Sequence, residues 1–303
     1  MLQGLKERVD AALLEKVNII CSRVRHLDPV KPNILWLHDL WNDPEAAHLA
    51  NPAERAKFAQ LVFVSHYQMH TYNLGLGVPL GAGVVLQNAI EPIPLHQKPA
   101  SPIRLIYHTT PHRGLEILVP CFEVLAKEYG SAVHLDVYSS FSIYGWPERD
   151  KQYHELFELC RRHPHITYHG FQPNHVIRAA LQQAHIFAYP SIWPETSCIA
   201  AIEAMSAECE VVCPNYAALP ETTANFAALY QFDEDINIHA NRFVNVLGGV
   251  IHTYLTDFSS VKERLKIQKA YMDSVYNWTG RARQWTYLLE SIVNRHYAQS
   301  KNT

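Results

Sequence analysis

Two glutamates frame the stretch of this sequence whose residue types best suit chemistry. Glu195 and Glu203 have seven residues between them, and both come after an apolar run, 184–189, that predicts a buried strand. Pro190 and Pro194 end regular structure, because proline donates no hydrogen bond to a sheet and restricts its predecessor. Beyond the prolines, the apolar residues recur at helical spacing.

The predicted helix begins at Thr196, with Ser197 as its N-cap, because a serine hydroxyl can accept a bond from a free first-turn N–H. Free N–H groups and the positive end of the helix dipole attract phosphate. Glu195 at the mouth and Glu203 further in would accept hydrogen bonds from sugar hydroxyls. The segment therefore suits a nucleotide sugar; the alternative is a capped helix with one solvated and one edge glutamate.

The stretch resembles the signature of the retaining, family-4-type glycosyltransferases of the GT-B fold. Glu195 and Glu203 match the E-x7-E motif, and Ala204-Met205, Val211-Val212 and Pro220-Glu221 match the family's next segments. The resemblance implies an α/β protein with two Rossmann-like, doubly wound parallel-sheet domains that face a cleft. It also implies transfer of a sugar from a nucleoside-diphosphate sugar to a hydroxyl of a glycan or lipid-linked acceptor, with retention of configuration.

A diphosphate site is predicted after the strand 103–107. Arg113 precedes Gly114 at the start of a helix, and a guanidinium there suits a diphosphate. The resemblance implies a second basic residue about five positions earlier, which here falls on Tyr107 or His108. We therefore expect one arginine, assisted by His108 or His112. A surface salt bridge is the alternative for Arg113.

The nucleobase site is predicted from the resemblance alone. Gly170 and Phe171, followed by Asn174-His175-Val176, resemble the family's nucleobase-contact loop. Tyr138, at the end of a predicted strand, is a second candidate for the wall of this site. A place in the core is the alternative for Phe171.

His38 follows an apolar strand in the first half of the chain. The resemblance implies that a histidine at this place reaches the transferred sugar. The adjacent Asp39 could orient its ring. A purely structural histidine is the alternative.

The resemblance also implies a division of roles. Glu195 would hold hydroxyls of the donor sugar, Glu203 the ribose, and His38 the sugar from the opposite domain. Arg113 and the helix N-terminus at Thr196–Cys198 would stabilise charge that builds on the diphosphate. The acceptor would attack on the face that the diphosphate leaves, with the departing phosphate taking its proton, and domain closure would exclude water.

Two other chemistries fit less well. Eight residues of helix rise about 12 Å, whereas glycosidase carboxyls lie about 5 to 9.5 Å apart, so Glu195 and Glu203 form a poor hydrolytic pair. His163, His165 and His169 have no carboxylate or cysteine partner in their pattern, which disfavours a metal site. The resemblance likewise implies no bound metal and no cofactor apart from the donor substrate.

Composition excludes several classes of protein. The chain has 303 residues, 48% hydrophobic and 18% charged, which is typical of a globular protein long enough for two domains. A net charge of −3 provides no basic field for nucleic acid. The start is charged and unlike a signal peptide, and no apolar run approaches the roughly 18 residues of a membrane span. Six cysteines without a CxxC pair indicate reduced thiols, so we expect a cytoplasmic protein with at most peripheral membrane contact.

Strands and helices alternate along the chain, which predicts parallel sheets. We expect a reduced acceptor-side domain over 1–95, a proline-rich linker over 96–102, a nucleotide-sugar domain over 103–275 and a helix over 276–303 that crosses back to the first domain. Predicted strands cover 17–21, 33–37, 61–65, 84–88, 103–107, 134–138, 166–169, 184–189 and 210–213, and predicted helices cover 2–15, 53–60, 68–74, 114–126, 153–162 and 174–183, followed by three at the C-terminus.

Two departures from the family pattern leave alternatives open. Glu208 and Glu210 stand where glycine and proline are common in the family, and the short first domain has no obvious counterpart of its glycine-rich loop. A degenerate, binding-only homologue and a nucleotide-sugar epimerase are therefore the alternatives to a transferase. The nucleotide, the sugar, the acceptor and the oligomeric state stay open.

Overall fold

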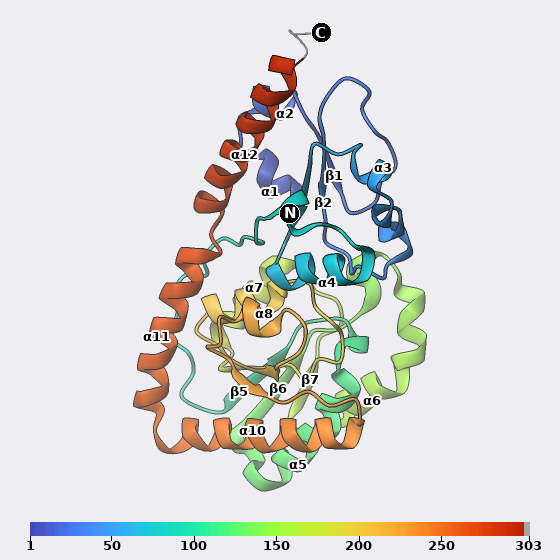
Figure 1. Cartoon of the computed structure of the whole chain (residues 1–303). Coiled ribbons are helices and arrows are strands. Elements are labelled where there is room, and N and C mark those ends of the chain that lie inside the picture. Colours follow the sequence, from blue (N-terminus) through green and yellow to red (C-terminus); the bar gives the residue numbers. More distant parts are fainter. Residues whose placement is uncertain (300–303) are drawn as a thin grey trace. The chain divides into compact units, whose positions relative to one another are not determined.

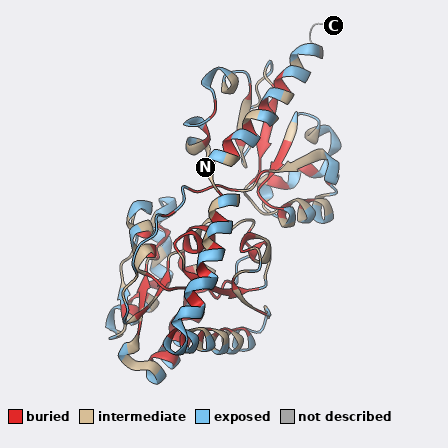
Figure 2. Ribbon diagram, turned by 90° about the vertical axis from the view of Figure 1, so that its left-hand side faces the viewer, coloured by how far each residue is buried: buried red, intermediate tan, exposed pale blue. Residues whose placement is uncertain are grey.

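The computed structural model describes residues 1–299, which form two compact units (Figure 1). The first contains Met1–Glu91 and the described residues from Ser274 onward, and the second is Pro92–Asp273. Buried residues concentrate on the strands of each unit and on the inward faces of its helices (Figure 2). None of the helices in residues 1–299 is long and apolar enough to cross a membrane.

The first unit is built on a parallel sheet of four strands in chain order. These are β1 (Asn18–Cys21), β2 (Asn33–Trp36), β3 (Gln60–Phe63) and β4 (Gly83–Val85). Because the sheet grows in one direction, right-handed crossovers place the connecting segments on one face. These segments are η1 (Pro44–Ala50), α3 (Pro52–Arg55) and α4 (His66–Leu76).

The two ends of the chain cover the other face of this sheet. Alternate strand residues such as Ile34 and Trp36 pack with Leu5, Trp285 and Leu289 in one apolar cluster. These partners come from α1 (Leu2–Lys6) and α12 (Trp278–Gln299), next to α2 (Ala11–Leu14). The sequence-distant α12 thus completes the core of the first unit.

Two helix predictions in this unit were wrong in extent. The predicted helix 2–15 is two short helices, because the chain breaks at residues 7–10 and Asp10 caps α2 by accepting from the Ala12 N–H. The predicted helix 53–60 is the single turn α3, because the Ala59 N–H already donates to the Asn33 carbonyl of the sheet at 2.8 Å.

The second unit contains a six-stranded, fully parallel sheet in the order β10-β9-β8-β5-β6-β7. The chain starts at β5 in the middle, winds outward through β6 and β7, and returns to β8 beside β5. Ligands of such sheets bind beyond the carboxyl ends of the strands, at the point where the winding reverses. The strands are β5 (Ile103–Tyr107), β6 (Val133–Val137), β7 (Ile166–Tyr168), β8 (Ile186–Ala188), β9 (Glu210–Pro214) and β10 (Ala228–Tyr230).

Helices cover both faces of this sheet. Figure 1 shows α7 and α8 on one face and α5 and α10 on the other. The helices are α5 (Leu115–Tyr129), α6 (His154–Arg162), α7 (Asn174–Gln183), α8 (Ile199–Ser206), α9 (Leu219–Thr222), α10 (Ile236–Thr256) and α11 (Phe258–Val275). The sequence patterns did not predict β10 and α9, which are three and four residues long.

The proline-rich stretch after residue 91 packs along the second unit. Ile93 is 1% exposed, and its N–H donates to Ser206 Oγ at 2.9 Å. Lys269 Nζ donates to the Ile93 carbonyl, and His185 Nε2 bonds the Pro99 carbonyl at 3.0 Å. The second unit therefore begins at residue 92 and includes the stretch predicted as a linker.

Candidate functional site

A cavity of about 480 Å³ opens beyond the carboxyl ends of β5, β7 and β8 in the second unit. This is the edge at which the winding of the sheet reverses, as expected for a ligand site. The cavity gathers many of the residues singled out from the sequence: His108, Arg113, Phe171, Glu195, Ser197, Cys198 and Glu203.

A tight turn after β5 places Arg113. The residue lies in η3 (Pro111–Arg113), and Gly114 follows with a φ of +128°. A Cβ atom at Gly114 would overlap the carbonyl oxygen of Pro190, so only glycine lets the end of β8 approach this closely. The Arg113 Nε donates to Thr110 Oγ1 at 3.1 Å, which holds the guanidinium against the turn.

Arg113 forms an ion pair with Glu195. Its Nη1 donates to Glu195 Oε1, and the two side chains are 17% and 8% exposed. The same oxygen accepts from the Tyr189 hydroxyl at 2.5 Å. The arginine predicted for phosphate and the glutamate predicted for sugar hydroxyls are thus direct partners in this structure. Burial alone would lower the Arg113 pKa, but the charge of the Glu195 carboxylate keeps it raised.

The second carboxylate has its own cation. Glu203 accepts from Arg178 Nη1 at 2.8 Å and from Asn174 Nδ2 at 3.2 Å, and it is 6% exposed. Arg178 was not among the residues predicted from the sequence. It lies four residues after Asn174 in α7, and this spacing could have placed both side chains on one helix face.

The start of α8 differs from the prediction. The helix begins at Ile199 with Cys198 as its N-cap, so Ser197 is not the cap, and no side chain caps the helix. The Glu195 carbonyl accepts from the Ala218 N–H at 3.1 Å, which ties Glu195 to the next loop, whereas the Cys198 carbonyl accepts the first bond of the helix from the Ile202 N–H. Ser197 and Cys198 line the cavity, whereas Thr196 lies outside its lining.

Neither histidine near Arg113 supplies a second cation. The His108 ring lies 4.6 Å from the Phe187 ring, and burial lowers the His108 pKa to about 3. His112 stacks on Phe141 at 5.1 Å, and burial, followed by the charge of Arg113, lowers its pKa to about 4. Both are neutral at pH 7, so the assistance expected from them is neutral hydrogen bonding.

The candidates for the nucleobase wall meet in a small adjoining cavity of about 30 Å³. Tyr138, Gly170 and Phe171 line it, together with His108. Phe171 is 47% exposed and so is not a core residue. Gly170 has a φ of +65°, and the Tyr138 ring stacks on His169 at 4.1 Å.

His169, on which Tyr138 stacks, is held in place by Asp136. Its Nε2 bonds Asp136 Oδ1 at 2.9 Å, and Arg104 Nη2 donates to Asp136 Oδ2 at 2.6 Å. Despite burial, which alone would raise it, the Asp136 pKa stays lowered because of the His169 hydrogen bond and the Arg104 charge.

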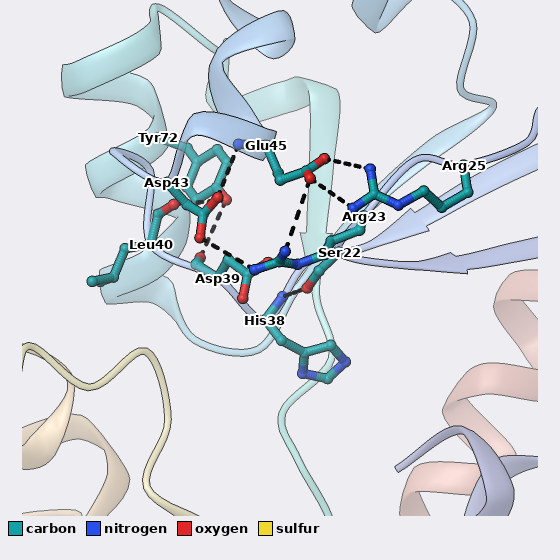
Figure 3. Close-up of polar contacts among 9 residues, drawn as sticks. All are labelled: Ser22, Arg23, Arg25, His38, Asp39, Leu40, Asp43, Glu45 and Tyr72. Carbon is teal, nitrogen blue, oxygen red and sulfur yellow. Dashed lines mark hydrogen bonds and ion pairs between the residues drawn. The ribbon is translucent and has the colours of Figure 1, made fainter. Parts of the chain in front are cut away.

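His38 lies in the first unit, at the end of β2. Its backbone N–H donates to Ser22 Oγ at 2.9 Å. Its ring lies 4.8 Å from that of Trp36, and burial lowers the pKa of the ring to about 4. The expectation that Asp39 orients this ring was wrong: Figure 3 shows the ring directed away from the Asp39 carboxylate. That carboxylate instead lies near Ser22 and Arg23, and burial raises its pKa.

Beside His38, two arginines and two further carboxylates form a surface network (Figure 3). Arg25 binds Glu45 through both terminal nitrogens at 2.7 and 2.9 Å, and Arg23 lies 3.9 Å from both Asp43 and Glu45. Within residues 1–299, no group of three or more His, Cys, Asp or Glu side chains is arranged to hold a metal ion.

Comparison with known proteins gives a match to one family model, over part of the chain, and a fold. The model of the family described as Glycosyl transferases group 1 matches residues 106–241. No curated protein matches the sequence. Among solved structures, Anabaena HepE in complex with UDP and glucose is 15% identical, with a TM-score of 0.67, over 86% of this chain and 72% of its own.

Two further structures support the same fold. A glycosyltransferase from Rickettsia africae ESF-5 is 15% identical, with a TM-score of 0.71, over 96% of this chain and 81% of its own. Sucrose-phosphate synthase from Thermosynechococcus elongatus is 14% identical, with a TM-score of 0.64, over 88% of this chain and 69% of its own. The predicted fold class, an α/β protein with parallel sheets in two domains of GT-B type, is therefore confirmed.

Proposed function

We propose that this protein transfers a sugar from a nucleoside-diphosphate sugar to a hydroxyl group of a glycan or lipid-linked acceptor, with retention of configuration. One observation carries the proposal: a single cavity gathers an arginine, two buried carboxylates and the uncapped start of α8. The family match over residues 106–241 and the complex of Anabaena HepE with UDP and glucose support a nucleotide-sugar donor.

The proposed roles follow from the chemistry of each group. Arg113 and the backbone N–H groups at the start of α8 would stabilise the negative charge that builds on the diphosphate as it leaves. Glu195 would accept hydrogen bonds from hydroxyls of the transferred sugar, and Glu203, steadied by Arg178, from the ribose.

The proposed bond changes keep configuration. The bond between the anomeric carbon and the diphosphate oxygen breaks, the acceptor oxygen bonds the same face of that carbon, and the departing phosphate takes the acceptor proton. Glu195 and Glu203 each have a cation of their own, Arg113 and Arg178 respectively. This pairing favours a role for both carboxylates in binding the donor rather than in proton transfer, because an ion-paired carboxylate is a weak acid–base catalyst.

A binding-only protein is the second candidate, and the neutral state of His108 favours it. With a pKa of about 3, this residue adds no positive charge beside Arg113 at pH 7. Turnover separates the candidates: a transferase consumes donor only with an acceptor, a binding-only protein never does, and an epimerase acts without one. We expect EDTA to leave transfer unchanged.

Calorimetric titration with UDP, GDP and ADP tests the donor site. We expect one nucleotide to bind, and Arg113→Ala to weaken binding by about 10- to 100-fold, since a hydrogen bond to a charged group contributes about 1.5–3 kcal/mol. Arg161→Ala is the matched control, because it removes an arginine that pairs with Glu158 outside the cavity. If the wild type binds none of the three nucleotides and none of their sugar-bearing forms, the transferase proposal is wrong.

A further inference from the structure

Each of the three guanidinium nitrogens of Arg113 has a partner within the second unit. Nε donates to Thr110 Oγ1, Nη1 to Glu195 Oε1, and Nη2 lies 3.4 Å from the Tyr144 hydroxyl. The face of the guanidinium lies over the Trp193 ring, 5.6 Å from its centre. A guanidinium carries five N–H groups, so these three bonds leave one on each terminal nitrogen for a phosphate. Among the partners, Glu195 is the one that carries a negative charge, and its carboxylate therefore opposes a phosphate that approaches this guanidinium.

Glu195 is itself held in its position beside Arg113. It is 7% exposed, and the Tyr189 hydroxyl donates to the oxygen that faces Arg113. Tyr189 is itself fully buried at the end of β8, with its ring stacked on Phe187 at 5.0 Å. Tyr189 therefore restricts the carboxylate to the position in which it neutralises the guanidinium.

Among the described residues that line the cavity, no second cation offsets this arrangement. The other lining residues that bear on this charge are Glu203, whose charge Arg178 balances from α7, and His108 and Cys198, which burial keeps neutral. A free nucleoside diphosphate would meet an arginine that is already neutralised, and displacing Glu195 would leave a buried carboxylate without its cation, which is costly.

A ligand that carries a sugar changes this balance. Sugar hydroxyls can donate to Glu195 when it releases Arg113, so the carboxylate keeps hydrogen bonds while the phosphate takes the guanidinium. The free nucleoside diphosphate, which is the product after transfer, offers no such hydroxyls at this position.

Resting on the function proposed above, we propose that Glu195, positioned by Tyr189, competes with phosphate for Arg113, so that the site favours the sugar-bearing donor over the free nucleoside diphosphate. Glu195 is then a specificity determinant as well as a sugar ligand. Its return to Arg113 after transfer weakens the hold on the product and promotes its release.

The test is calorimetric titration of wild type and Glu195→Gln with three pairs of probes: UDP and UDP-glucose, GDP and GDP-mannose, ADP and ADP-glucose. We expect the wild type to bind the sugar-bearing member of one pair more tightly. Glu195→Gln should bind the free diphosphate of that pair about 5- to 50-fold more tightly than the wild type, because it no longer neutralises Arg113. The difference within the pair should shrink accordingly.

Two further variants sharpen the result. Glu210→Gln is the matched control, since it removes an equally buried carboxylate paired with Arg264 at the opposite edge of the sheet, and it should leave both affinities unchanged. Tyr189→Phe should shift the preference in the same direction as Glu195→Gln but less, while a purely structural role would weaken both ligands alike. Glu195→Ala replaces Glu195→Gln if the latter does not fold.

The outcomes distinguish this proposal from the proposed function. If wild type binds a diphosphate and Glu195→Gln binds it equally or more weakly, the competition is refuted and the donor site stands. A diphosphate that binds only Glu195→Gln would support the competition. If no probe binds either protein, both proposals fail.

Discussion

At the scale of single residues, the site depends on one glycine as much as on its charged groups. Gly114 joins η3 to α5 with a φ of +128° and lies against the Pro190 carbonyl. It brings the turn that carries Arg113 to the end of β8, close to Glu195. Gly114 therefore allows the close backbone approach that places Arg113 beside Glu195.

Gly114→Ala should therefore lower the free energy of unfolding by about 1–3 kcal/mol, because the methyl group meets backbone and the φ is strained. Gly249→Ala is the control: this glycine lies in α10 with nothing near its missing Cβ, and alanine should raise stability by up to about 1 kcal/mol. Urea unfolding of both variants measures this. Equal stability of Gly114→Ala and wild type would contradict the close contact between Gly114 and Pro190.

A buried histidine makes stability depend on pH. His185 is 2% exposed, and its Nδ1 accepts from the backbone N–H of Arg104. Burial lowers the His185 pKa to about 4. The unfolded chain, with a histidine pKa near 6.5, binds a proton that the folded protein does not bind between these values. Stability from this residue is therefore complete above pH 6.5 and is lost as the pH falls towards 4.

The expected slope approaches about 1.4 kcal/mol per pH unit for this one histidine. Urea unfolding between pH 7 and pH 4.5 should show a steeper loss for wild type than for His185→Gln. Parallel curves for the two proteins would show that His185 titrates alike in the folded and unfolded chain.

At the scale of elements, α8 ends in a motif that usually contains glycine. The Cys209 N–H donates to the Ala204 carbonyl and the Glu208 N–H to the Met205 carbonyl, which is the Schellman arrangement. Glu208 occupies its left-handed position with a φ of 56°. The turn where the sequence departs from the family pattern thus has the geometry that glycine favours.

Glu208→Gly should raise the free energy of unfolding by about 1 kcal/mol, because a residue with a Cβ atom costs about that much in the left-handed region. The same change at Glu263, an exposed position inside α11, should lower it by about 1 kcal/mol. Thermal unfolding of both variants tests the opposite signs, and a loss of stability in Glu208→Gly would refute the assignment.

At the scale of the whole molecule, the cavity belongs to one continuous segment. Every residue that lines it lies between residues 92 and 273, whereas the first unit needs both ends of the chain. The two ends of this segment are joined within it, because Lys269 Nζ donates to the Ile93 carbonyl and to Asp273 Oδ2.

A fragment of residues 92–273 should therefore fold alone and bind the nucleotide within about threefold of the full chain. It should not transfer sugar, because His38, the predicted sugar contact from the other domain, is absent. Circular dichroism, calorimetry and a transfer assay measure the three properties. The same fragment with Arg113→Ala is the control, and a folded fragment that has lost nucleotide binding would contradict the placement of the site.

The sequence by itself determined the order and type of most elements in the second unit. The expected strand 103–107 and helix 174–183 agree with β5 and α7, because long runs with a clear period specify local structure. It also singled out Arg113, Glu195 and Glu203, which the structure places in the lining of one cavity.

Only the tertiary structure decided which of these groups meet. Arg113 and Glu195 are 82 positions apart, and Tyr189 and Arg178 had no motif to mark them, yet they set the charge balance of the cavity. The neutral state of His108 arises from its burial, which lowers its pKa to about 3, and its ring packs on Phe187 across two strands. Pairing and burial depend on how distant strands are brought together, and local sequence patterns do not encode that arrangement.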